Sequence, residues 1–215
     1  MEKHKKCTFC FHNAQIMDLK YNTKKIFIPY NKNLKKFIKK YNIYNVGELE
    51  LLEFIPTASF MFRTENLSKM PDWFEKCFVG DWPLKLIMTS FGYAYYINEV
   101  MSVYRKNAKG SVTNKNNLKE KQSIEGKKEL LHKREQFINW IDEFTKYKYK
   151  DVFDYRRAQH KIEELLIEKK GKEILVNKYL NKLGVKERIK VLIKIYFPQI
   201  IKFYKKFKSN RRKDG

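Results

Sequence analysis

The sequence predicts an α/β fold followed by an all-helical region, and three observations support this prediction. The chain of 215 residues is 43% hydrophobic and 15% aromatic, which is enough for a packed core. Residues 1–113 alternate aromatic and β-branched segments, typical of strands, with short helical ones. From Leu118 onward, apolar residues recur at the three- and four-residue spacing of helices. A stretch rich in Gly, Ser and Asn at 106–116 separates the two patterns, so we expect domains at 1–113 and 114–215.

Strands are expected where aromatic and β-branched residues gather, at 7–18, 57–67 and 94–105. Residues 21–33 carry several Asn and Lys around Pro29, which predicts a loop. Short helices are predicted at 34–43 and 46–55, because apolar residues recur there at helical spacing. The first half should therefore fold as a sheet with helices packed against it.

The segment GDWPLKLIMTSFG, residues 80–92, predicts a short buried helix between two of these strands. Asp81 is a preferred N-cap residue, and Pro83 suits the first turn, where its missing N–H has no cost. One apolar face follows from the spacing of Leu84, Ile87, Met88 and Phe91. Gly92 can end the helix in the left-handed conformation. Ser or Asn would cap as well as Asp, so capping explains the position of Asp81 but not its carboxylate.

The second half predicts three helices in succession. Two apolar faces define the first two helices: Phe137, Trp140, Ile141 and Phe144, then Ile162, Leu165 and Leu166. The second helix should end near Gly171. A third should begin around 174–179 and stop at Gly184.

The net charge of +23 is unevenly distributed. Residues 114–215 hold 29 basic and 14 acidic side chains, and residues 185–213 hold eleven basic ones against Glu187 alone. This last segment interleaves Ile, Leu, Phe and Tyr with Lys, as membrane-interface helices do, and Pro198 should kink or divide it. We expect residues 185–213 to bind an anionic membrane surface. Nucleic acid would attract the same charge, but the chain has no helix-turn-helix, RNP or zinc-knuckle pattern, so no nucleic-acid partner is expected.

Nothing in the sequence predicts export or a membrane span. The N-terminal MEKHKKCTFC has no apolar signal-peptide region, and no run of apolar residues approaches the length of a span. Three cysteines, Cys7, Cys10 and Cys77, suit a reducing compartment better than a disulfide framework. With the basic end, these features predict a cytoplasmic protein that is peripheral on the inner face of the cell membrane.

Four residues near the N-terminus are of zinc-ligand type at short spacing: His4, Cys7, Cys10 and His12. Cys7 and Cys10 fall on opposite faces of a regular strand, because side chains alternate along it. Zinc needs four ligands that converge tetrahedrally. We therefore predict no metal site in this segment.

Residues 54–111 contain three segments that together resemble one known family: FIPTASFMFR, GDWPLKLIMTSFG and YINEVMSVYRKNAKGS. They are similar to the acceptor half of bacterial family 2 glycosyltransferases. That pattern runs from a Pro-Thr-x-Ser strand ending in Arg, through a Gly-Asp-Trp-Pro-Leu helix start, to a strand ending in Tyr-Arg. CFHNAQIMD and YFPQIIKFYKKFK also resemble segments of this family. The resemblance implies a partial glycosyltransferase A-type mixed sheet with flanking helices, followed by the basic all-α region.

The resemblance implies that Asp81 is the catalytic base, which takes the proton of the acceptor hydroxyl during an inverting transfer. It also implies that five residues bind substrate: Gly80, Trp82, Glu99, Tyr104 and Arg105. Arg105 could donate to a diphosphate, or it could form an ordinary ion pair at the sheet edge. The implied activity is a hexosyltransferase-type transfer from a nucleotide-sugar donor to a cell-surface glycan or lipid-linked acceptor.

The chain departs from the family pattern in two ways. Asn107 stands where the family often has a His that contacts metal or phosphate. The Asp-x-Asp metal motif and the nucleotide-sugar-binding half that carries it are absent, as are GxxxxGK and GxGxxG loops. The family implies a divalent cation, Mg²⁺ or Mn²⁺, yet this chain alone is expected to be inactive and to bind nucleotide-sugars weakly. The alternative is a non-enzymatic, basic α/β remnant associated with membranes or nucleic acid.

Overall fold

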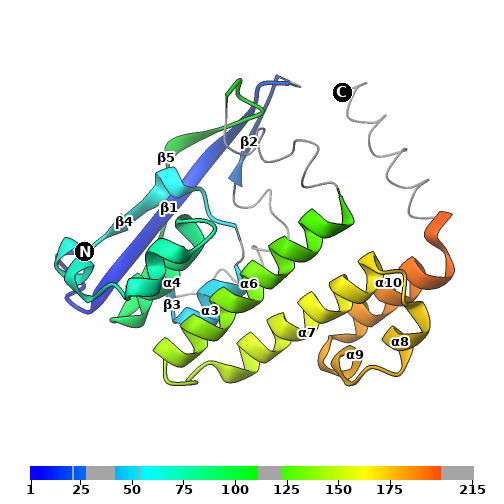
Figure 1. Ribbon diagram of the computed structural model, residues 1–215. Coiled ribbons are helices and arrows are strands. Elements are labelled where there is room, and N and C mark those ends of the chain that lie inside the picture. The colour runs from blue at the N-terminus through cyan, green and yellow to red at the C-terminus, as the bar shows by residue number, and fades with distance from the viewer. Residues whose placement is uncertain (21, 28–41, 53, 111–122, 200–215) are drawn as a thin grey trace. The chain divides into compact units, whose positions relative to one another are not determined.

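The computed structural model describes residues 1–20, 22–27, 42–52, 54–110 and 123–199 (Figure 1). The chain divides into two compact units. Unit 1 is Met1–Lys115 with Gln136–Val152, and unit 2 is Asn116–Glu135 with Phe153–Gly215. The first part of helix α6, Ile124–Phe144, therefore belongs to unit 2 and its last part to unit 1. This division differs from a single cut near residue 113, because α6 belongs to both units.

Unit 1 is built on a mixed sheet, in keeping with the α/β class that the sequence predicts. Its five described strands are β1 Cys7–Asp18, β2 Thr23–Ile26, β3 Ile43–Tyr44, β4 Phe60–Phe62 and β5 Tyr93–Lys106. The sheet order is β2-β1-β5-β3, and β4 also pairs with β1. The two long strands, β1 and β5, are parallel neighbours (Figure 1), and the other described pairs are antiparallel. The predicted strands at 7–18 and 94–105 are thus confirmed to within one residue.

Aromatic side chains join these strands into one core. The ring of Phe11 on β1 lies 5.9 Å from that of Tyr44 on β3 and 5.1 Å from that of Tyr96 on β5. Phe9, two residues earlier on the same face of β1, meets Phe60 of β4 edge to face at 5.0 Å. The aromatic content that predicted strands is therefore what holds the sheet together across its pairs.

Two predictions in this half were wrong at the level of single elements. Residues 23–26 form strand β2 instead of part of a loop, since an edge strand tolerates the charged Lys24 and Lys25 that suggested a loop. The predicted strand at 57–67 is reduced to β4, with 3₁₀ turns at Thr57–Ser59 and Thr64–Lys69. In the first turn, the hydroxyl of Ser59 donates to the carbonyl of Pro56 at 2.6 Å, a local bond that competes with the sheet.

Helix α3, Val46–Leu51, confirms the start of the helix predicted at 46–55. A capping box fixes its beginning: the backbone N–H of Glu48 donates to Asn45 Oδ1, and the N–H of Asn45 donates to Glu48 Oε2, both at 3.0 Å. A further 3₁₀ turn covers Asp72–Lys76. Most of the helix predicted at 34–43 lies outside the described residues, and its last residue, Ile43, begins β3.

Helix α4, Asp81–Ser90, packs against β1, where the Thr8 hydroxyl donates to the carbonyl of Met88 at 2.6 Å. The last part of α6 packs on it as well, since Phe144 meets Phe91 edge to face. Covered by both, α4 is buried around most of its circumference, at Pro83, Lys85, Leu86, Ile87, Met88 and Thr89. The buried surface of α4 is therefore wider than the single apolar face that was predicted. Two residues of that predicted face, Leu84 and Phe91, are only half-buried.

Gly92 follows α4, but the predicted left-handed end was wrong, because Gly92 does not have a positive φ. A glycine is needed at this position for another reason, which is the lack of space for a side chain. A Cβ atom at this position would lie 2.2 Å from the carbonyl oxygen of Lys6 and 2.9 Å from Cγ2 of Thr8. Gly92 therefore permits the backbone of the segment before β1 to approach the end of α4.

The apolar face predicted at 137–144 is confirmed as a packing face in unit 1. Trp140 stacks on Trp73 at 5.6 Å, and Phe137 meets Trp82 edge to face at 4.5 Å. Phe144 lies edge to face against Trp73 at 6.0 Å. The last part of α6 thus contributes an aromatic cluster to the same unit as the sheet.

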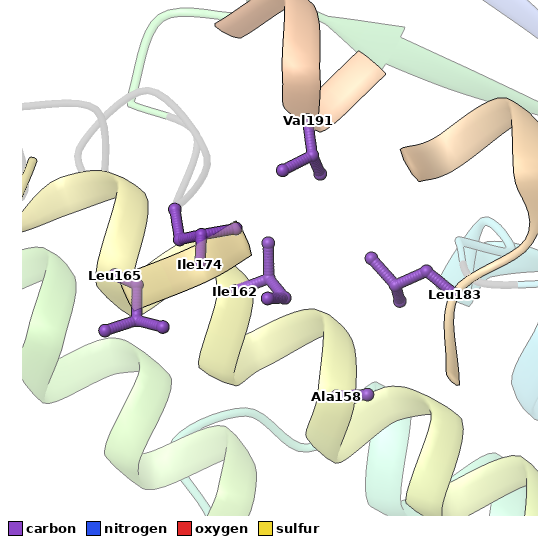
Figure 2. Close-up of a cluster of buried hydrophobic side chains, with 6 residues drawn as sticks. All are labelled: Ala158, Ile162, Leu165, Ile174, Leu183 and Val191. Carbon is purple, nitrogen blue, oxygen red and sulfur yellow. The ribbon is translucent and has the colours of Figure 1, made fainter. Parts of the chain in front are cut away.

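Unit 2 is helical. Its described helices after α6 are α7 Lys150–Ile167, whose residues up to Val152 belong to unit 1, then α8 Gly171–Leu175, α9 Lys178–Lys182 and α10 Val185–Tyr196. Figure 2 shows its buried cluster, whose side chains come from successive helices and the turn before α10: Ala158, Ile162, Leu165, Ile174, Leu183 and Val191. The predicted third helix is in fact two short ones. Asn177 interrupts it and caps α9, accepting from the backbone N–H of Tyr179 at 3.0 Å.

The basic end of the chain is divided at Pro198, as the sequence predicts. Helix α10 ends at Tyr196, and Phe197 leaves the helical conformation with φ −129° and ψ 53°. The residue before a proline is sterically disfavoured in the α conformation, which accounts for the break. Residues 200–213 of the predicted membrane segment lie outside the described residues. Within the described part of the chain, no helix is long and apolar enough to span a membrane.

Candidate functional site

Asp81 lies at the first helical position of α4, one residue later than predicted. The N-cap is Gly80, with φ −93° and ψ −37°, and no side chain caps this end. Asp81 nevertheless satisfies the helix start, since its Oδ1 accepts from the backbone N–H of Trp82 at 2.8 Å. Its Oδ2 accepts from the hydroxyl of Thr57 at 3.2 Å. A carboxylate in the first turn also interacts favourably with the helix dipole.

Asp81 lines a cavity of about 180 Å³ in unit 1. Its wall is formed by the segment after α3, the start of β4 and the first turns of α4: Phe54, Ile55, Phe60, Asp81, Trp82 and Lys85. The wall is thus largely aromatic and aliphatic, with one carboxylate and one ammonium group. Apolar walls with a few placed polar groups are typical of ligand sites.

Lys85 lies one turn after Asp81, and its side chain is only 2% exposed. A buried lysine is uncommon in proteins, and this one forms part of the wall of the cavity that Asp81 lines. The sequence interpretation missed Lys85. A lone charge inside the apolar segment PLKLIM was the feature that could have revealed it.

The Trp82 side chain is positioned by one hydrogen bond and two ring contacts. Its indole Nε1 donates to Oε2 of Glu50 at 2.5 Å, and Glu50 is itself 2% exposed on α3. The ring packs edge to face against Phe137 at 4.5 Å and against Phe78 at 6.1 Å. These contacts fix the orientation of the Trp82 ring at the cavity wall. The sequence interpretation also missed Glu50, which belongs to no motif, and it gave no role to Thr57, which lies in the Pro-Thr-x-Ser segment.

The predicted substrate-binding residues of β5 divide between two environments. Tyr104 is half-buried and meets Phe54, a residue of the cavity wall, edge to face at 5.4 Å. Arg105 follows it, so it points to the other face of the strand, where it is exposed in register with Met17 of β1. Glu99 is exposed as well. The structure thus brings Tyr104 into the surroundings of Asp81, whereas Glu99 and Arg105 are not among the described wall residues.

The two remaining site residues are Gly80 and Asn107. Gly80 is exposed beside Asp81, with open space where a Cβ atom would lie. Asn107, at the position where the resembling family often has His, has φ 60° and donates from Nδ2 to Oδ1 of Asp18 at 2.8 Å. Asn107 thereby ties the end of β5 to the end of β1.

Within the described ranges, no cluster of three or more His, Cys, Asp or Glu side chains could hold a metal ion. The wall of the Asp81 cavity offers one carboxylate and one ammonium group, which does not fit Mg²⁺ or Mn²⁺, since these ions take several oxygen ligands. His4 instead bonds the hydroxyl of Tyr93 at 3.1 Å, and His12 bonds the carbonyl of Asn13 at 2.8 Å.

The thiols near the N-terminus are not activated. Burial raises the pKa of Cys7 and of Cys10 above that of a free thiol, so both are protonated at neutral pH. Burial likewise raises the pKa of Cys77 to about 11. These side chains are therefore small apolar groups in the packing of unit 1 and not nucleophiles.

No family model, no curated protein and no solved structure matches this chain in comparisons with known proteins.

Proposed function

We propose that the cavity beside α4 is the acceptor side of a glycosyltransferase active site in which Asp81 is the general base. The position of the Asp81 carboxylate is the observation that carries this proposal. Each of its oxygens accepts one hydrogen bond, from Trp82 N–H and from Thr57, and a carboxylate oxygen can accept more than one. Asp81 can therefore still accept the proton of a substrate hydroxyl in the cavity that it lines.

The proposed reaction moves one sugar from a nucleotide-sugar to an acceptor. The acceptor oxygen attacks the anomeric carbon while its proton passes to Asp81. The bond from that carbon to the diphosphate oxygen breaks, and the nucleoside diphosphate leaves with the electron pair. Attack opposite to the leaving group inverts the configuration. A positioned base contributes about 10²–10⁴ to the rate of such a step.

The neighbours of Asp81 support this role. The indole of Trp82, with Phe54 and Phe60, forms an apolar wall against which the ring of a sugar can lie. The resemblance of the Gly80–Leu84 segment to the acceptor half of family 2 glycosyltransferases is independent of these contacts and supports the same role.

The test is a transfer assay with the intact chain. Membranes and soluble extract from cells in which its gene is deleted supply the acceptors and the donor-binding half that this chain lacks, and a panel of labelled UDP-, GDP- and dTDP-sugars supplies donors. Added wild-type protein should restore sugar transfer, whereas Asp81→Asn should restore at least about 10²-fold less. Asp72→Asn, an exposed aspartate of the same unit, is the matched control and should restore transfer fully. The proposal fails if wild-type protein restores no transfer, or if Asp81→Asn restores it fully.

A further inference from the structure

Helix α10 of unit 2 is not a free amphipathic segment, because one of its faces belongs to the core. Val191 is 6% exposed within the buried cluster of Figure 2, and Ile195 packs against that cluster. A Cβ atom at Gly171 would lie 3.0 Å from Cγ2 of Ile195, which shows how closely α8 and α10 approach. This face is therefore unavailable to any partner.

A second face of α10 is apolar and yet exposed. Val185 is 70%, Ile189 51% and Tyr196 59% exposed. Successive helical residues are about 100° apart, so positions four and seven residues apart fall on one stripe. Phe197, directly after the helix, is 57% exposed. An apolar stripe on the surface of a water-soluble fold marks an interaction site more often than isolated apolar residues do.

A row of lysines begins at one edge of this stripe. Lys186, Lys190 and Lys194 are exposed and four residues apart, so the row starts beside Val185 and turns away from the stripe by about 40° at each step. The one acid of the helix is turned inward. Glu187 Oε1 accepts from the Tyr155 hydroxyl at 2.5 Å and from Gln159 Nε2 at 3.2 Å. The outward charge of α10 is therefore positive along its whole length.

We propose that this α10 surface, defined as Val185, Ile189 and Tyr196 with Lys186, Lys190 and Lys194, binds the face of an anionic lipid bilayer. The apolar stripe would enter the boundary between headgroups and acyl chains, and the lysine row would contact lipid phosphates. Nucleic acid would use the lysines but would leave the apolar stripe exposed. The combination of the two rows thus favours a membrane. This inference does not depend on the transferase proposal.

The experiment is co-sedimentation of the intact chain with phosphatidylcholine vesicles that contain or lack phosphatidylglycerol. Replacing Lys186, Lys190 and Lys194 by Gln should weaken binding to anionic vesicles on the order of 100-fold at low salt. Val185→Gln with Ile189→Gln should weaken it at least about tenfold, and this loss should persist in molar salt. Residues 200–215 are identical in all variants, so the differences report on α10 alone.

Two controls match these changes elsewhere in unit 2. Lys127 on α6, Lys169 after α7 and Lys172 on α8 are exposed, and replacing them by Gln removes the same charge. Val176 is 87% exposed outside α10, and Val176→Gln removes the same kind of apolar surface. Both controls should bind vesicles like wild type, and all variants should keep their melting temperature, since only exposed side chains change.

Three outcomes would overturn the proposal. The first is equal binding to vesicles with and without phosphatidylglycerol. The second is an equal loss in the control variants, which would mean that total charge or total apolar surface decides binding. The third is a nucleic-acid interface: the Val185/Ile189 variant would then bind vesicles like wild type, and a single-stranded RNA would compete fully for the lysine row.

Discussion

The hydroxyl of Thr57 donates a hydrogen bond of 3.2 Å to Oδ2 of Asp81, and thereby joins the turn before β4 to the first turn of α4. Thr57 lies 24 residues before Asp81. This bond holds a flexible carboxylate in one orientation at the cavity wall.

Thr57→Val should therefore lower sugar transfer without abolishing it. The change keeps the shape of the side chain and removes one hydrogen bond, worth about 0.5–1.5 kcal/mol, so we expect a loss of about 2- to 12-fold in kcat. The measurement is the membrane transfer assay with saturating donor and acceptor. Thr64→Val, at an exposed threonine of the same unit, should leave the rate unchanged. An unaltered rate in Thr57→Val would show that Asp81 needs no orientation by Thr57.

Trp82→Phe should destabilise unit 1. The variant keeps a ring next to Phe137 but removes the indole N–H that donates to the buried carboxylate of Glu50. Losing a donor to a buried charged group costs about 1–3 kcal/mol. Urea unfolding followed by circular dichroism measures the change in the free energy of unfolding. Comparing Trp82→Phe, Glu50→Gln and the double variant isolates the coupling of the pair, and additive losses would argue against a direct bond.

Gly92→Ala and Gly80→Ala form a second stability test, with opposite expectations for the same chemical change. At Gly92 the new methyl group meets the Lys6 carbonyl at 2.2 Å, so the backbone before β1 must shift, at a cost of about 1–3 kcal/mol. At Gly80 the methyl group meets open space, and the backbone conformation is one that alanine adopts easily. Gly80→Ala should be neutral, or stabilising by up to about 1 kcal/mol. Similar unfolding free energies for the two variants would contradict the packing described for Gly92.

His160 should make unit 2 sensitive to acid. Burial lowers the pKa of His160 to about 4, and the positive charges of Arg134 and Arg156 act in the same direction. The folded unit therefore keeps His160 neutral, whereas the unfolded chain protonates it below about 6.5. Its contribution to stability is complete above that pH and is lost as the pH falls from there through about 4.

The free energy of unfolding should therefore fall by on the order of 2–3 kcal/mol between neutral pH and pH about 4. Urea unfolding of the wild type and of His160→Gln, followed by the helical circular dichroism signal, should show a steeper acid loss in the wild type. His132→Gln, at an exposed histidine of α6, should retain the wild-type slope. Parallel slopes for wild type and His160→Gln would rule out this histidine as the acid-sensitive group.

The parts of the fold that the sequence predicted are those with strong local patterns. Strands β1 and β5 have long aromatic and β-branched runs, and the apolar face at 137–144 has a regular helical period. The elements predicted wrongly depend on contacts with other elements, which no pattern within the segment reveals. Lys24 and Lys25 form a strand only because they pair with Met17 and Ile16 of β1, and α4 is buried on several sides only because two elements cover it.

The residues of the candidate site divide in the same way, into those with a local sequence pattern and those without one. Asp81 could be recognised because it belongs to a continuous segment that resembles a family. Lys85, Glu50 and Thr57 reach the Asp81 region through the arrangement of α3, α4 and the turn before β4, and no local pattern brings them together. The role of Gly92 was predicted wrongly for the same reason, because the backbone that it approaches, at Lys6, lies far earlier in the sequence.

The parallel pairing of β1 with β5 also affects folding while the chain is being synthesised. Cys7 pairs with Tyr93, so β1 leaves the ribosome roughly 85 residues before its main partner. At a synthesis rate of about 5–20 residues per second, β1 is exposed for several seconds, and among the described residues made in that time its strand partners are the short β2 and β4. Its segment CTFCF is apolar and rich in aromatic residues, and an exposed strand edge of this kind is prone to aggregation. Slower elongation between β1 and β5 would lengthen this period, so the yield of soluble protein should depend on codon choice between residues 19 and 106.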